Sequence, residues 1–78
     1  MKILQIPLRV KRYEFLYSHL DCDCIASYEK NSNEIEVIAF SETKEENARL
    51  KQYYYSNNLM GKYRILQGID KREVNSID

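Results

Sequence analysis

The sequence predicts a single α+β domain in which a four-stranded antiparallel sheet carries two helices on one face. Three observations predict it. Apolar residues alternate with a period of two in four short runs, they recur at helical spacing in two other segments, and turn-forming residues separate these runs. The 78 residues leave room for one modest core, because a chain of this size buries only about 60% of its unfolded surface.

The first predicted strand covers residues 3–10, where Leu4, Ile6, Leu8 and Val10 alternate with their neighbours. Pro7 interrupts this run and has no amide hydrogen to give to a neighbouring strand. It therefore places the strand at a sheet edge or a bulge, ends it near Pro7, or begins a helix there. We retain the strand.

A short amphipathic helix is predicted over residues 12–20. Tyr13, Leu16, Tyr17 and Leu20 recur at the spacing of one helical face. Residues 22–29 and 35–40 then alternate as two strands, and residues 31–33 between them are Asn and Ser, so a β-hairpin is expected.

The second helix has the clearest start signal. Thr43 and Glu46 have the spacing of a capping box, in which each side chain bonds the other residue's backbone amide. The helix is expected to end near Asn57, Asn58 and Gly61, and residues 63–69 form the last strand. The domain is expected over residues 1–72, with a flexible tail over 73–78.

The element order, βαββαβ, is that of ferredoxin-like folds. Alternation places one set of residues on the helix-covered face: Leu4, Ile6, Leu8, Cys24, Ala26, Val37, Ala39, Ile65 and Ile69. The opposite, open face then carries Ile3, Ile25, Ile38, Phe40 and Leu66. A register slip of one residue would exchange the two faces, and this alternative stays open.

The net charge of zero conceals a blocked pattern. Residues 1–12 hold four bases and no acid, residues 14–46 hold nine acids and two bases, and residues 49–72 hold six bases and one acid. With the usual strand order of this fold, the last strand lies beside the first. The sheet would then have a basic flank and an acidic flank, which could orient a charged partner.

Composition excludes several classes of protein. The longest apolar run is four residues, whereas a membrane-spanning helix needs about 20, and the first residues lack the apolar region of a signal peptide. We therefore expect a cytoplasmic protein with no membrane partner. With nine aromatic residues, two glycines and one proline, the chain has the material for a folded core.

Catalytic and metal-binding patterns are weak. His19, Cys22 and Cys24 are ligand types that zinc prefers, but a fourth ligand and the usual spacing are missing, and two reduced structural thiols are the expectation. A Cys–His pair is the one nucleophile arrangement available, and no glycine-rich phosphate loop exists. We expect no enzyme activity, no cofactor and no metal.

The open apolar face is the main functional indication, because contiguous exposed apolar residues mark interaction sites. We expect a protein-binding module that acts by stoichiometric contact on a target protein or in a homodimer. It would be an inhibitor, an adaptor or a regulatory subunit, of a kind that a phage or plasmid can encode. Phe40→Asp should abolish the contact and leave folding intact. The expected contact residues are Ile3, Arg9, Ile25, Glu36, Ile38, Phe40, Arg64 and Leu66.

The alternative is a single-stranded nucleic-acid binder, because aromatic rings beside basic residues can stack on bases. The absence of net positive charge counts against it. Its expected residues are Lys11, Arg12, Arg49, Lys51, Tyr54, Tyr55, Lys62 and Arg64.

Overall fold

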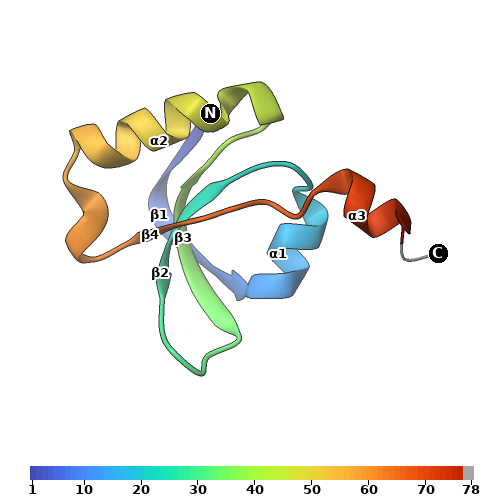
Figure 1. The fold of residues 1–78 in the computed structure, drawn as a ribbon. Helices are drawn as coiled ribbons and strands as arrows, with labels where there is room; N and C mark the ends of the chain where they lie inside the picture. The colour runs from blue at the N-terminus through green and yellow to red at the C-terminus, as the bar shows by residue number, and fades with distance from the viewer. Residues whose placement is uncertain (77–78) are drawn as a thin grey trace.

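The structure, a computed structural model, describes residues 1–76. Its strands are β1 (Lys2–Lys11), β2 (Cys24–Tyr28), β3 (Glu34–Phe40) and β4 (Arg64–Leu66). Its helices are α1 (Arg12–Ser18), α2 (Asn47–Ser56) and α3 (Lys71–Ser76), and the 3-10 turns η1 (Lys44–Glu46) and η2 (Leu59–Gly61) flank α2. The strands form one antiparallel sheet (Figure 1), which confirms the predicted α+β class.

The strands lie in the order β1-β3-β2-β4. This differs from the expected order, because β4 pairs with β2 rather than with β1, and Ile25 lies opposite Ile65. Ile65 packs against the cluster that contains Ile25 and Leu50, and this contact stabilises β4 at the β2 edge. The basic residues of β1 and β4 therefore lie at opposite edges, and the expected single basic flank does not form.

β1 is an edge strand, as Pro7 indicated, but it continues through Pro7 to Lys11. Ile3 lies opposite Ala39 and Leu8 lies opposite Val37, so residues 4–7 of β1 face only Ile38. This bulge accommodates the missing amide hydrogen of Pro7. It also leaves Ile6, expected beneath a helix, 81% exposed.

The two larger helices contact different faces of the sheet. Phe15 and Leu16 of α1 belong to one apolar cluster, the α1 cluster, with Cys24, Ala26, Ile35 and Val37. Leu50 and Tyr54 of α2 belong to a second, the α2 cluster, with Ile25 and Ala39. Because Cys24, Ile25 and Ala26 are consecutive in β2, their side chains alternate between faces. The helices thus cover opposite faces rather than one, and Figure 1 shows them on different sides of the strands.

The β2–β3 hairpin is confirmed. Cys24 lies opposite Phe40 and Tyr28 lies opposite Ile35, and Asn31 in the turn has a φ of 69°, in the left-handed region that Asn tolerates. A second bulge falls at Ile38, because Ile25 faces Ala39 while Ala26 faces Val37. This bulge shifts the alternation within β3, so Val37 joins the α1 cluster and Ala39 the α2 cluster.

Two helix details differ from expectation. In α1, Tyr13 and Tyr17 are exposed, and Phe15 and Leu16 are the buried pair. Before α2, the predicted capping box is replaced by the η1 turn, and Thr43 Oγ1 lies 3.3 Å from a Glu46 carboxylate oxygen.

The C-terminal segment is more ordered than the sequence indicated. Residues 73–76, expected in a flexible tail, belong to α3, while residues 77–78 of that tail lie outside the described residues. Asp70 precedes α3, and its Oδ1 accepts a hydrogen bond of 2.8 Å from the Arg72 amide. This is the contact of an N-cap side chain.

Candidate functional site

β1 carries three exposed apolar side chains, with Ile3 on the α2 side of the sheet, opposite Ala39, and Leu8 on the α1 side, opposite Val37. Ile3, Ile6 and Leu8 are 50%, 81% and 44% exposed. Within residues 1–76 no strand pairs with the outer edge of β1. We call these three residues the β1 surface.

A groove adjoins this surface between β1 and α1. It has a volume of about 320 Å³ and is lined by Leu8, Val10, Glu14, Phe15, Ser18, His19 and Phe40. The Phe15 and His19 rings are stacked with centroids 4.2 Å apart, and the Phe40 ring meets them edge-on at 5.6 and 5.0 Å. These contacts give the groove a largely apolar, aromatic wall.

The predicted contact residues do not share one open face. Ile25 is fully buried, and Ile38 packs against the α2 cluster. Phe40 and Leu66 pack instead against the α1 cluster, on the other face. Of the five apolar members, Ile3 alone is strongly exposed, because Ile25 and Ile38 pack on the α2 side of the sheet and Phe40 and Leu66 on the α1 side.

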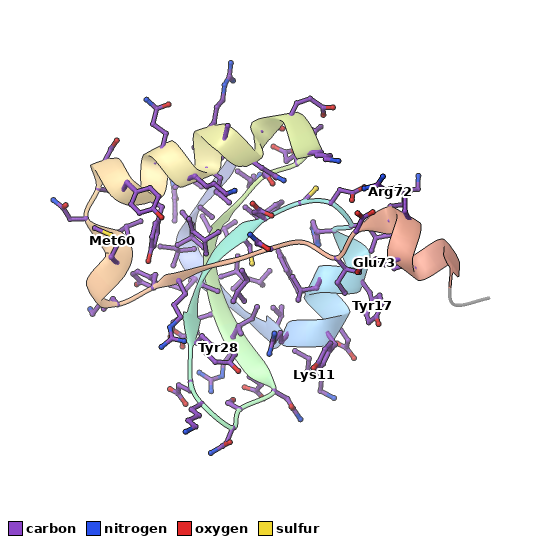
Figure 2. All side chains as sticks on the ribbon, viewed as in Figure 1. Lys11, Tyr17, Tyr28, Met60, Arg72 and Glu73 are labelled. Atoms are coloured by element: carbon purple, nitrogen blue, oxygen red, sulfur yellow. The ribbon has the colours of Figure 1, made fainter. Side chains whose placement is uncertain are left out.

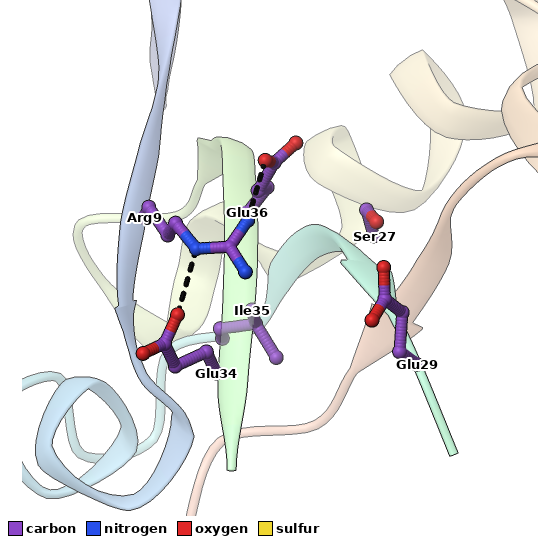
Figure 3. A pocket seen from close by; sticks show the side chains of 6 residues that line it. All are labelled: Arg9, Ser27, Glu29, Glu34, Ile35 and Glu36. Carbon is purple, nitrogen blue, oxygen red and sulfur yellow. Dashed lines mark hydrogen bonds and ion pairs between the residues drawn. The ribbon is translucent and has the colours of Figure 1, made fainter. Parts of the chain in front are cut away.

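The polar residues of the predicted contact set, Arg9, Glu36 and Arg64, do not all lie together either. Arg9 Nε donates to Glu34 at 2.7 Å and Arg9 Nη1 donates to Glu36 at 3.0 Å (Figure 3), beside a hollow of about 50 Å³. The hydrogen bond with Glu34 is the main cause that raises the pKa of Arg9 above its usual value. Arg64 lies on β4, at the opposite edge of the sheet from Arg9.

The residues predicted to bind a nucleic acid do not form one exposed surface. Tyr54 is 7% exposed and its hydroxyl donates to the Tyr63 carbonyl at 2.7 Å, so its ring is not free to stack on a base. Lys51 lies 3.9 Å from a carboxylate oxygen of Asp23. Arg49, Tyr55 and Lys62 are exposed on or near α2, and Lys11 is exposed at the end of β1.

Two members of that set meet at a residue that sequence reasoning missed. The Arg12 and Arg64 guanidinium carbons lie 5.2 and 5.6 Å from the centre of the Tyr28 ring. Arg12 Nη1 also lies 3.4 Å from the Tyr28 hydroxyl. Figure 2 labels Tyr28 near the end of β2. Sequence alone gave no signal for the contact of Arg64 with Tyr28, because it depends on β4 lying beside β2.

Both cysteines are buried free thiols. Burial raises the pKa of Cys24 to about 12, and burial also raises the pKa of Cys22, although a hydrogen bond with Ser41 opposes the shift. A raised pKa leaves little of the nucleophilic thiolate at neutral pH. Across residues 1–76 no three His, Cys, Asp or Glu side chains are grouped to hold a metal ion.

A buried polar network, also missed from the sequence, joins three loops. The Asp23 amide donates to Ser41 Oγ at 2.9 Å and to Asn47 Oδ1 at 3.2 Å. Asp23 Oδ1 accepts from the Gly68 amide at 3.0 Å, and Asn47 Nδ2 donates to the Asp21 carbonyl at 3.0 Å. These bonds satisfy polar groups of residues that line a pocket of about 240 Å³, which indicates a structural role.

Comparison with protein-family models, curated proteins and solved structures found no match for this chain. Among the described residues, no helix has the length and apolar character needed to cross a membrane. The proposals below therefore depend on the geometry of the chain itself.

Proposed function

We propose that this protein is a small protein-binding module that acts by stoichiometric contact, as an inhibitor, an adaptor or a regulatory subunit. The observation that carries the proposal is the joint exposure of Ile3, Ile6 and Leu8 on one edge strand. Single exposed hydrophobic side chains are common on protein surfaces, but a group of them beside an apolar groove is typical of an interaction site.

The groove supports an anchored contact. Interfaces commonly obtain most of their binding energy from a few side chains that fill well-packed pockets. Leu8 belongs both to the β1 surface and to the groove wall. A partner's apolar side chain could therefore enter the groove while its neighbours contact Ile6 at the edge of the sheet.

The contact should use side chains rather than an added strand. Pro7 lacks an amide hydrogen, the bulge at residues 4–7 interrupts the regular strand, and Lys2 and Lys11 lie at its ends. These features discourage pairing with another strand. The two free thiols support a reducing compartment, and we place the protein in the cytoplasm.

The test compares Ile6→Asp with Met60→Asp. Met60 is 55% exposed on η2, so it is a matched exposed apolar residue away from β1 (Figure 2). A partner is first isolated from the source organism with the wild-type protein, and its affinity for each variant is measured by calorimetry. Ile6→Asp should weaken binding about tenfold or more, and Met60→Asp should change it little.

Two results would contradict the proposal. One is wild-type affinity for Ile6→Asp, and the other is an equal loss with Met60→Asp. Thermal unfolding of both variants serves as the control for folding, because both side chains are more than half exposed.

A further inference from the structure

Three segments that are distant in the sequence bring hydrogen-bond donors to one ring. Arg12 begins α1, Tyr28 ends β2 and Arg64 begins β4. Both guanidinium groups lie within 6 Å of the centre of the Tyr28 ring, at 5.2 and 5.6 Å, the range of cation–π contact. Arg12 also lies 5.4 Å from the Tyr13 ring, so aromatic contacts hold it on two sides.

This cluster has donors without matching acceptors. Within residues 1–76, neither Arg12 nor Arg64 forms an ion pair, and Arg12 Nε is buried without a hydrogen-bond partner. The Tyr28 hydroxyl accepts from Arg12 Nη1, so its own hydrogen remains available for an acceptor. Arg9 is the contrasting case, because Glu34 and Glu36 neutralise it.

We propose that Arg12, Tyr28 and Arg64 bind a phosphate group. Among residues 1–76 no carboxylate forms an ion pair with either guanidinium group, and an anion that reaches their N–H groups would balance this positive charge. Arginine presents several N–H donors in a planar fork that matches phosphate oxygens, and such charge-assisted hydrogen bonds are stronger than neutral ones. The Tyr28 hydroxyl adds a further donor at the same place.

The site is separate from the β1 surface. Tyr28 and Arg64 belong to β2 and β4, while β1 lies at the other edge of the sheet, and Arg12, which directly follows β1, is not among the residues that line the groove. A failure to bind phosphate would therefore leave the proposed protein contact through β1 intact. A failure of that contact would likewise leave the phosphate site intact. The phosphate could be free, part of a nucleotide, or part of a nucleic-acid strand, and these sources share the same chemistry.

The experiment titrates inorganic phosphate and follows the arginine side-chain Nε–H signals by NMR. Phosphate should shift the signals of Arg12 and Arg64 but not that of Arg49, which is exposed on α2. Arg12→Gln and Arg64→Gln should each weaken phosphate affinity about tenfold or more, as expected for loss of a charged hydrogen-bond donor. Arg49→Gln removes the same charge elsewhere and should change the affinity less than about twofold.

A second arm identifies the source by replacing phosphate with single-stranded oligothymidylate. If the wild-type protein binds the oligomer and both Arg12→Gln and Arg64→Gln weaken this binding, the result would support the site and assign it to nucleic acid. Phosphate binding without oligomer binding would support the site for a free phosphate or a nucleotide. Roughly millimolar phosphate that shifts neither signal, or an equal effect of Arg49→Gln, would overturn the proposal.

Discussion

Gly68 lies against the backbone of Cys22. A Cβ atom built on Gly68 would come within 2.4 Å of the Cys22 carbonyl oxygen and 2.5 Å of its nitrogen. Residue 68 must therefore be glycine for the segment after β4 to pass over the start of β2. This close approach also brings the Gly68 amide to Asp23, where it donates its hydrogen bond.

The first prediction follows from this approach. Gly68→Ala should lower the free energy of unfolding by about 1–3 kcal/mol, because backbone must move to admit the methyl group. Gly61→Ala is the control, since a Cβ there meets nothing within 4 Å. Urea unfolding measures both. Equal stability of Gly68→Ala and wild type would show that the segment shifts freely.

The second prediction concerns the polar network. Asn47→Ala should lower the free energy of unfolding by about 1–3 kcal/mol, because it removes the donor to the Asp21 carbonyl and one of the two acceptors of the buried Asp23 amide. Asn57→Ala deletes a comparable side chain that bonds the Tyr53 carbonyl at the surface. It should change stability by about 0.5 kcal/mol or less. Urea unfolding compares the two variants. A similar loss of unfolding free energy in Asn47→Ala and Asn57→Ala would contradict a structural role for the polar network.

The third prediction replaces an expectation drawn from the sequence. Phe40→Asp should destabilise the fold by about 2 kcal/mol or more, because it puts a carboxylate against the Phe15 and His19 rings. It is therefore unsuitable as a test of partner binding. Ile6→Asp should leave the melting temperature nearly unchanged. A Phe40→Asp variant as stable as Ile6→Asp would mean that the aromatic contacts contribute little.

The fourth prediction concerns alkaline pH. Burial raises the pKa of Cys24 from 9.0 to about 12, so the folded chain keeps a proton that the unfolded chain releases above pH 9. The stability from this thiol is fully present below pH 9 and is lost as pH rises toward 12, with a slope of about 1.4 kcal/mol per pH unit. Cys24→Ala should show a shallower decline in unfolding free energy over this range. Identical slopes for the two proteins would exclude Cys24 as the cause.

Local sequence signals predicted part of the local structure. The alternation around residues 31–33 predicted the hairpin, and an edge strand and a bulge were among the alternatives that Pro7 left open. An additional signal was present but unused, since Asp70 has the side chain of an N-cap and precedes the residues of α3. Each of these features depends on residues close together in the chain.

Long-range relationships were not predictable in the same way. The bulge at Ile38 changes which face each β3 residue occupies, and strict alternation does not reveal it. The position of β4 depends on packing of Ile65 with Ile25 beneath α2. The predicted open face was wrong for these reasons, and the Tyr28 cluster could not be anticipated because it requires the observed strand order.

The interrupted β1 strand has a consequence for assembly. A sheet can extend from molecule to molecule only if both of its edges offer regular backbone donors and acceptors. Here one edge is the three-residue β4, and the other has a proline and a bulge within it. Chains of this protein are therefore poorly suited to open-ended fibre growth by strand pairing.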